Sequence, residues 1–175
     1  MYTSIPFSVM DIFKQLPEST RRFHALKNIL VVEPAPVYAH QDILGSINYE
    51  LYSYVRRHKL GKVLVSPVDV YLNEEHVFQP DILFISNRRL PVINKKGIFG
   101  APDLIVEILS PSTAKYDRGQ KKDIYERCGV SEYWLVDPET CVSEGFHLKN
   151  GSFQALPAAR GIIKSVLLGE TFRFQ

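Results

Sequence analysis

The stretch APDLIVEILSPST, residues 101–113, places a carboxylate, Glu107, in the middle of an apolar run with the pattern of a β-strand. An unpaired carboxylate in such surroundings costs on the order of several kcal/mol. Glu107 therefore needs a partner, which could be a metal ion, a lysine, or solvent at a sheet edge. A second acid, Asp81, opens the strand-like run QPDILFIS, residues 79–86, and Lys121 lies on a predicted helix downstream. Two acids and a lysine indicate metal-assisted phosphodiester chemistry.

The composition is that of one globular domain without a bulk excess of charge. A chain of 175 residues with 45% hydrophobic side chains fits a single domain, residues 1–175. With 21 basic and 19 acidic residues the net charge is +2, so any basic surface must be local. Cys128 and Cys141 form no CxxC pair, which argues against a zinc ribbon or a disulfide framework and predicts a reducing cytoplasm. No basic leader and no apolar run near 20 residues is present, so we expect a soluble, unprocessed protein with no membrane contact.

Helical and strand-like patterns alternate in the first half of the chain. The most regular pattern is a helix whose apolar residues recur at helical spacing, with Gly61 as its expected stop. Three short β-rich runs follow, and we expect them to pair antiparallel as a meander. The predicted segments are a helix at 9–16, a strand-like run at 21–36, a helix at 41–60, and strands at 63–66, 68–72 and 82–85.

The second half predicts a strand-helix-strand unit around Glu107. Residues 86–102 are charged and rich in glycine and proline, as in a loop. The strand of Glu107 is followed by a helix from about Asp117 to Cys128, closed by Gly129, and by the strand EYWLVD, residues 132–137. Such a unit is usually parallel and right-handed. The tail from Ser143 onward alternates in the manner of further strands.

Asp81 and Glu107 are hard oxygen ligands of the kind that hold Mg²⁺ or Mn²⁺. If their strands are neighbours, a backbone carbonyl such as that of Ile108 would add a third oxygen. The ion would polarise a phosphate and lower the pKa of a bound water. Lys121 could orient that water or offset the charge that develops on the phosphate. The candidate catalytic residues are therefore Asp81, Glu107 and Lys121.

The order Pro-Asp, then Glu-Ile-Leu, then a helical lysine resembles the PD-(D/E)XK nuclease superfamily, and more closely the Uma-type (Uma-two) family of proposed restriction endonucleases. In the superfamily pattern a lysine stands two positions after the acid, where this chain has Leu109. As in the Uma-type group, the lysine is matched on the helix, by Lys121. The matching segments are residues 37–72, 79–86 and 100–139.

The resemblance implies an α/β (α+β) restriction-endonuclease-like fold, with a mixed central sheet flanked by helices. It also implies a metal-dependent endonuclease that hydrolyses phosphodiester bonds in DNA with Mg or Mn. Many nucleases of this fold cut as pairs, so a homodimer is a further expectation. The alternative is a catalytically degenerate protein that keeps the fold as a binding or assembly module.

One departure from the family pattern concerns the first strand. The Tyr-Glu pair of the family, whose glutamate joins the metal site, is matched here by Phe23-His24, and the Asp-Gly that follows is matched by Lys27-Asn28. His24 is thus the third candidate metal ligand beside Asp81 and Glu107, and histidine is a poor ligand for Mg²⁺. A histidine at this position has three possible consequences: a preference for Mn²⁺, weak metal binding, or loss of activity. Glu33 or Glu50 could stand in if the fold brings them close.

Several of these residues also have a purely structural interpretation. Asp81 alone could begin a strand, Asp103 is best explained as a structural cap, and Glu107 could be exposed on an edge strand. Lys121 shares a helix face with Asp117 and Tyr125, whereas Lys122 points about 100° away and should be solvated.

Other polar and aromatic groups have equally open interpretations. His40 with Gln41 looks like a family motif, and helix capping is the alternative explanation. Ser110, Ser112 and Thr113 fit a phosphate-binding turn and a helix cap equally well. Tyr133 and Trp134 are expected in the core. The basic clusters at 56–59, 88–89 and 95–96 could follow phosphates, although solvated surface is the default.

Overall fold

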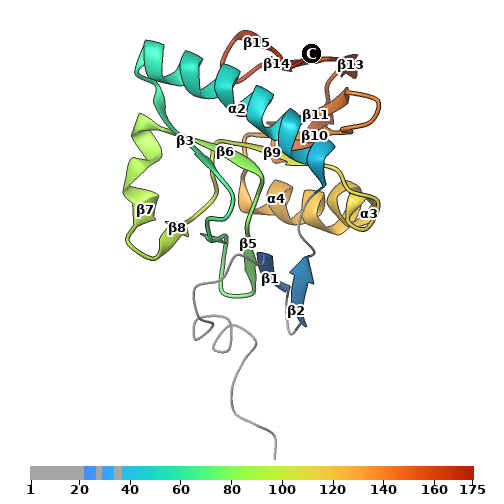
Figure 1. Ribbon diagram of the computed structural model, residues 1–175. Helices are drawn as coiled ribbons and strands as arrows, with labels where there is room; N and C mark the ends of the chain where they lie inside the picture. Colours follow the sequence, from blue (N-terminus) through green and yellow to red (C-terminus); the bar gives the residue numbers. More distant parts are fainter. Residues whose placement is uncertain (1–21, 27–28, 34–36) are drawn as a thin grey trace, which may run out of the picture.

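The structure is a computed structural model that describes residues 22–26, 29–33 and 37–175 (Figure 1). In the first two strands, β1 (Arg22–Leu26) and β2 (Ile29–Glu33), the backbone is described, and Ile29 is the one side chain there that is described too. The helix that the sequence predicts at residues 9–16 lies outside the described residues. Within them no helix is long and apolar enough to cross a membrane.

A seven-stranded mixed sheet forms the centre of the fold. Its strand order is β12-β11-β10-β9-β6-β3, with β13 attached to β11. Strands β9 and β10 are parallel, as the strand-helix-strand pattern predicted, and the other pairs are antiparallel. The strands are β3 (Gly61–Val65), β6 (Ile82–Ser86), β9 (Leu104–Ile108), β10 (Glu132–Val136), β11 (Val142–Lys149), β12 (Ser152–Ala155) and β13 (Ala159–Arg160).

Helix α2 (Tyr38–His58) covers one face of this sheet. Its buried face carries Ile43, Ile47, Leu51 and Val55, spaced four residues apart, which pack against residues of β3, β6, β9 and β10. The hairpin of β14 (Ile162–Ser165) and β15 (Glu170–Arg173) packs beside the helix and completes this layer, so the tail forms strands as predicted.

The prediction that Gly61 ends helix α2 is wrong. The helix ends at His58, and Lys59 takes the left-handed conformation with φ of 54°. The amide of Lys59 then bonds back to the carbonyls of Arg56 and Val55, which closes the last turn. Gly61 instead begins β3, where a side chain would collide with the backbone carbonyl of Ile85 on the neighbouring strand.

A helical segment of three parts covers the opposite face of the sheet. It runs through α3 (Ala114–Tyr116), the π-helical turn η2 (Asp117–Lys121) and α4 (Lys122–Cys128), so it begins three residues before the predicted start. Gly129 ends it with φ of 81°, as predicted. Ile124 and Tyr125 of α4 pack with Tyr133 and Leu135 of β10, which confirms Tyr133 as a core residue.

The predicted meander is only partly right. Strand β3 pairs with β6, but β4 pairs with β5 and β8 in a second sheet of order β2-β1-β5-β4-β8-β7. The segment 86–102, predicted as a loop, contains a 3-10 helix and two of these strands. The remaining elements are β4 (Val70–Tyr71), β5 (His76–Phe78), η1 (Asn87–Val92), β7 (Ile93–Asn94) and β8 (Gly97–Phe99).

Candidate active site

Asp81 sits immediately before β6 and joins three elements of the fold. Its side chain is buried, with a relative exposure of 1% for the residue. Oδ2 accepts a hydrogen bond of 2.8 Å from the backbone N–H of Ile108 in β9, and Nε2 of His40 in the first turn of α2 lies 3.2 Å from the same oxygen. The carboxylate is therefore fixed between the central sheet and helix α2, as a residue at a functional site must be.

Glu107 lies in β9 between β6 and β10, so the edge-strand interpretation of this residue is wrong. The residue is 3% exposed. Its Oε1 accepts a hydrogen bond of 2.9 Å from the hydroxyl of Tyr125 and lies 2.8 Å from Nζ of Lys121. The partner that the sequence demanded for this buried acid is thus a lysine, supplemented by a tyrosine.

Lys121 is as buried as the acids that it contacts, at 2% exposure. Its Nζ also lies 3.3 Å from Oδ1 of Asp117, four residues earlier. Both residues belong to the π-helical turn η2, a distortion found often at functional sites because it rotates side chains relative to a regular helix. The predicted shared face of Asp117, Lys121 and Tyr125 is confirmed by their contacts.

Several acids are buried close to one another in this cluster. Among the described residues, Asp81, Glu107 and Asp117 are buried acids, and the ammonium of Lys121 contacts two of them, Glu107 and Asp117. The pKa of Glu107 is raised from 4.5 to about 8, chiefly by burial; Lys121 opposes this shift, and the charges of Asp81 and Asp117 add to it. Burial also raises the pKa of Tyr125 well above its usual range, so this phenol stays a neutral donor. Burial and the neighbouring acids therefore disfavour the ionised form of Glu107, and a bound cation would favour it.

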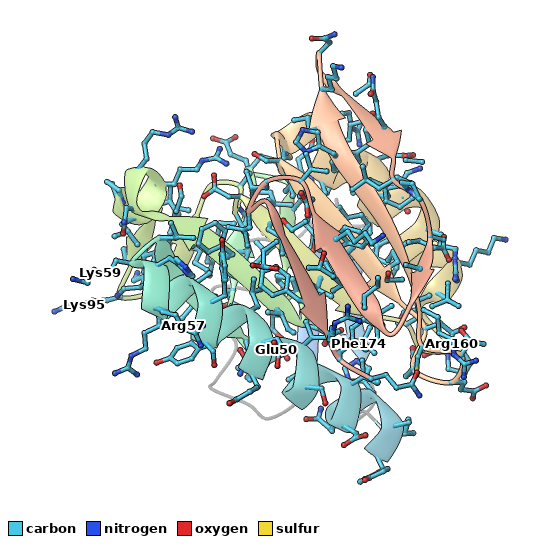
Figure 2. All side chains as sticks on the ribbon, turned by 90° about the horizontal axis from the view of Figure 1, so that it is seen from above. Glu50, Arg57, Lys59, Lys95, Arg160 and Phe174 are labelled. Atoms are coloured by element: carbon cyan, nitrogen blue, oxygen red, sulfur yellow. The ribbon has the colours of Figure 1, made fainter. Side chains whose placement is uncertain are left out.

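The structure brings together the three residues predicted to be catalytic. Asp81 and Glu107 lie on neighbouring strands, and Lys121 contacts Glu107 directly. The side chain of His24 lies outside the described part of the structure, as does that of Glu33. Glu50 lies ten residues along α2 from His40, about 15 Å at the rise of a helix, so the fold does not bring it to the site (Figure 2).

Asp103 is structural, as predicted. It accepts a hydrogen bond of 2.7 Å from the backbone N–H of Ser86, and Arg89 lies 3.5 Å away. It thereby ties the start of β9 to the end of β6.

Two residues of the site were missed in the sequence. His40 does not cap helix α2, whose N-cap is Val37, but lies inside its first turn and contacts Asp81. The signal was its position on the apolar face, three residues before Ile43 and seven before Ile47. Asp117 was noted only as a neighbour on the helix face. Its spacing of four residues from Lys121 was the available signal.

The residues present fit a divalent cation of the Mg²⁺ type. Such ions need only one or two protein carboxylates, and waters and substrate phosphates supply the other ligands. Among residues 37–175 and the two described strands, no group of three His, Cys, Asp or Glu side chains has metal-ligand geometry. Asp81 and Glu107 are two hard oxygen ligands buried beside a third acid, Asp117, which meets the minimum for Mg²⁺ or Mn²⁺.

The comparison with solved structures first defines the fold. The chain resembles a crystal structure described as a putative nuclease belonging to DUF820, from Anabaena variabilis, with a TM-score of 0.72. The likeness covers 86% of this chain and 84% of that one at 21% identity. At this identity it shows the fold, which is the predicted mixed sheet with flanking helices.

The family model then identifies the chain more closely. Residues 10–170 match the Uma2 family, described as "Putative restriction endonuclease", and the chain belongs to this family. An uncharacterized protein of Synechocystis sp. is 31% identical over 97 residues. That match spans 54% of this chain and 54% of the Synechocystis protein.

Proposed function

We propose that the protein is a metal-dependent endonuclease that hydrolyses phosphodiester bonds in DNA. The observation that carries the proposal is the buried meeting of Asp81, Glu107 and Lys121 on neighbouring elements of a nuclease-like fold. The family description and the description of the structural neighbour support the same class of activity.

In this proposal Asp81 and Glu107 hold Mg²⁺ or Mn²⁺. Both contacts to Glu107, from Tyr125 and Lys121, are made to Oε1, and no described residue donates a hydrogen bond to Oε2. We assign Oε2 to the ion. The backbone N–H of Ile108 and the ring of His40 keep the carboxylate of Asp81 in place. When bound, the ion would polarise the scissile phosphate and lower the pKa of the attacking water.

Lys121 has two tasks in this arrangement. Its ammonium, held between Glu107 and Asp117, fixes the orientation of the ligand Glu107. The same positive charge lies where negative charge would develop on the phosphate, and its burial keeps that interaction strong. Asp117 and Tyr125 hold the lysine and the glutamate in this position rather than contacting the reacting atoms.

The substitution Glu107→Gln tests the proposal. Cleavage of supercoiled plasmid should fall by at least about 10²–10³-fold, because the amide is a weaker ligand at an electrostatic site. Wild type and variant are compared in parallel with Mg²⁺, Mn²⁺ and EDTA, and Glu139→Gln, an exposed acid, is the matched control. Equal cutting by wild type and Glu107→Gln, with folded spectra, would place the active site elsewhere.

The alternative proposal is a catalytically degenerate protein that uses the fold for binding or assembly. The departure of Phe23-His24 from the family pattern motivates it. It predicts no cleavage by the wild type with either metal, while binding of DNA or of a protein persists. A single domain at 1–175 and a cytoplasmic location stay predictions, and a homodimer has no support in the described residues.

A further inference from the structure

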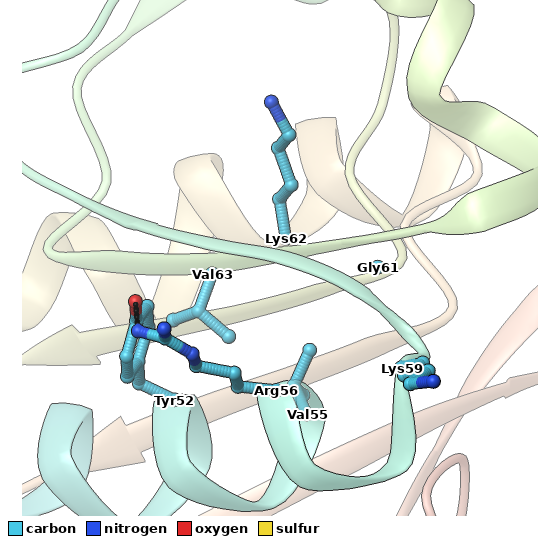
Figure 3. Close-up of a pocket in the computed structure, with 7 residues that line it drawn as sticks. All are labelled: Tyr52, Val55, Arg56, Lys59, Gly61, Lys62 and Val63. Atoms are coloured by element: carbon cyan, nitrogen blue, oxygen red, sulfur yellow. Dashed lines mark hydrogen bonds between the residues drawn. The ribbon is translucent and has the colours of Figure 1, made fainter.

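A hollow of about 360 Å³ lies between the C-terminal end of α2 and the edge strand β3 (Figure 3). It is remote from the cluster around Glu107 and forms no part of the proposed active site. No carboxylate is among the residues that line it, which are Tyr52, Val55, Arg56, Lys59, Gly61, Lys62 and Val63.

Three exposed cations lie at or beside this hollow. Arg56 and Lys59 come from the end of α2, and Lys62 comes from β3. In the described chain none of the three forms an ion pair. Cations at a helix C-terminus also stabilise the helix dipole, but this explanation does not extend to Lys62, which is on a strand. Positive charge gathered without a counter-charge is the usual mark of a surface that binds an anion.

The arrangement of the cations selects an extended anion. Figure 3 shows Lys59 at one end of the hollow, Arg56 directed toward Tyr52, and Lys62 pointing to the other side of β3. Arg56 is held there by a hydrogen bond of 2.9 Å from its Nη1 to the hydroxyl of Tyr52. Because the charged groups do not converge on one point, a single small anion cannot contact all three, whereas successive phosphates of a strand can.

Two elements connect the hollow with the candidate active site. Along α2, Arg56 lies sixteen residues from His40, about 24 Å. Along β3, Lys62 lies four residues from Ser66, about 13 Å, and the N–H of Ser66 bonds to the carbonyl of Asp81 at 3.0 Å. At about 3.4 Å per nucleotide, these lengths correspond to roughly four to seven nucleotides.

Exposed tyrosines flank the same route. Tyr49 and Tyr52 are 69% and 43% exposed and share a face of α2 with Arg56, at spacings of three and four residues. Tyrosine hydroxyls beside basic side chains are hydrogen-bond donors of the kind that contact phosphate oxygens. A symmetric contact with a second copy would instead bring the cations of this patch against themselves.

We propose that the basic surface of Arg56, Lys59 and Lys62, beside the hollow, docks the phosphate backbone of a nucleic-acid strand, four to seven nucleotides from the bond to be cut. This inference rests on the proposed nuclease function and names the surface that aligns its substrate. The net charge of +2 is compatible with it, because the cations are concentrated locally.

The first test measures binding alone. Fluorescence anisotropy with a labelled duplex of about 20 base pairs, in EDTA, compares wild type with the triple variant Arg56→Gln, Lys59→Asn, Lys62→Gln. Asparagine is chosen at Lys59 because it tolerates the φ of 54° there. The matched control removes three exposed cations outside this surface: Lys149→Gln, Arg160→Gln and Lys164→Gln. Figure 2 shows Arg160 at the opposite side of the molecule from Lys59.

The docking triple variant should bind at least about 10-fold more weakly, with the slope of log affinity against log salt reduced by roughly 2–3, whereas the control should change little. Equal losses in the two triple variants would overturn the proposal. So would full displacement of the DNA by millimolar inorganic phosphate, or a change from dimer to monomer on Tyr52→Ala in sedimentation.

A second test separates this inference from the proposed function. With a series of duplex lengths, wild-type affinity should rise as the duplex extends past about seven base pairs on one side of the site, and the docking variant should lose this gain. If the protein cuts no DNA but wild type gains affinity with duplex length and the docking variant does not, the docking surface is supported and the nuclease proposal fails. If it cuts DNA and the difference is absent, the docking surface is wrong.

Discussion

Helix α2 carries a histidine at each end, and the two ends have opposite environments. His40 is 5% exposed and contacts the buried Asp81, whereas His58 is exposed and its Nδ1 lies 2.9 Å from the carbonyl of Tyr54 one turn back. At the first end the carboxylate of Asp81 is desolvated and depends on its partners. At the second end water solvates each cation. The same helix therefore joins a site that tolerates little change to a surface that tolerates much.

The largest expected effect is the loss of Lys121. Lys121→Met would leave Glu107 and Asp117 as buried carboxylates without their cation, and should lower the free energy of unfolding by about 3–5 kcal/mol. The neighbouring Lys122, half-buried with its Nζ 4.7 Å from the ring of Phe146, is the matched control. Lys122→Met should cost less than about 1 kcal/mol. If urea denaturation shows similar losses of unfolding free energy for Lys121→Met and Lys122→Met, the contrast between the two lysines is contradicted.

The next effect is a dependence of stability on pH. The pKa of Glu107 is raised from 4.5 to about 8 in the folded chain, so between these values the folded state binds a proton that the unfolded state has released. Protonation of Glu107 therefore contributes stability that is fully present below pH 4.5. This contribution is lost as the pH rises through 8. At about 1.36 kcal/mol per pKa unit, the difference over the whole range is about 5 kcal/mol at most.

Glu107→Gln removes this titration, so its free energy of unfolding should rise relative to wild type between pH 5 and 8. Denaturation at pH 5, 6, 7 and 8 measures the difference. Mg²⁺ or Mn²⁺ should stabilise wild type at pH 8 and leave Glu107→Gln unchanged, because a ligand that binds only the folded state adds stability. If the unfolding free energies of wild type and Glu107→Gln change with pH in parallel, the raised pKa of Glu107 is contradicted.

The sequence predicted best what depends on neighbours along the chain. The apolar spacing in α2 and the unit from β9 to β10 reveal helix and strand directly, because each pattern is local. The pairing of β4 with β5 and β8 could not be predicted, since strand pairing is decided by packing between sheets. The same limit explains His40, whose partner Asp81 lies 41 residues away.

The prediction that Glu107 has a partner is confirmed by its contact with Lys121, and the reason is physical. A carboxylate in an apolar strand is costly to bury without a partner, whatever the rest of the fold is. The need for a partner could therefore be inferred from the sequence alone. Which residue supplies it depends on the turn η2, whose π-helical winding no local pattern indicated.

A smaller effect should separate the two histidines. His40→Gln removes the ring that holds Asp81 and should lower cleavage by about 10–100-fold, the usual range for residues that orient a metal ligand. His58→Gln on the exposed end should change cleavage by less than about twofold, as expected of a surface substitution. Titrating Mn²⁺ adds a second measurement, in which His40→Gln should need more metal for half-maximal cleavage. Loss of activity at saturating metal with unchanged metal dependence would assign His40 a merely structural role.

The smallest effect concerns an ion pair on the same π-helical turn as Lys121. Arg118 contacts Glu144 at 2.7 Å, a distance shorter than that between Lys121 and Glu107, but its side chain is 42% exposed. Distance alone would predict the stronger interaction here, whereas solvent screening predicts about 0.2–1 kcal/mol for such a pair. Arg118→Gln should therefore lower the free energy of unfolding by less than about 1 kcal/mol, with the change reduced further in 0.5 M salt. A loss as large as that of Lys121→Met would show that geometry, rather than burial, sets the strength of charge pairs in this fold.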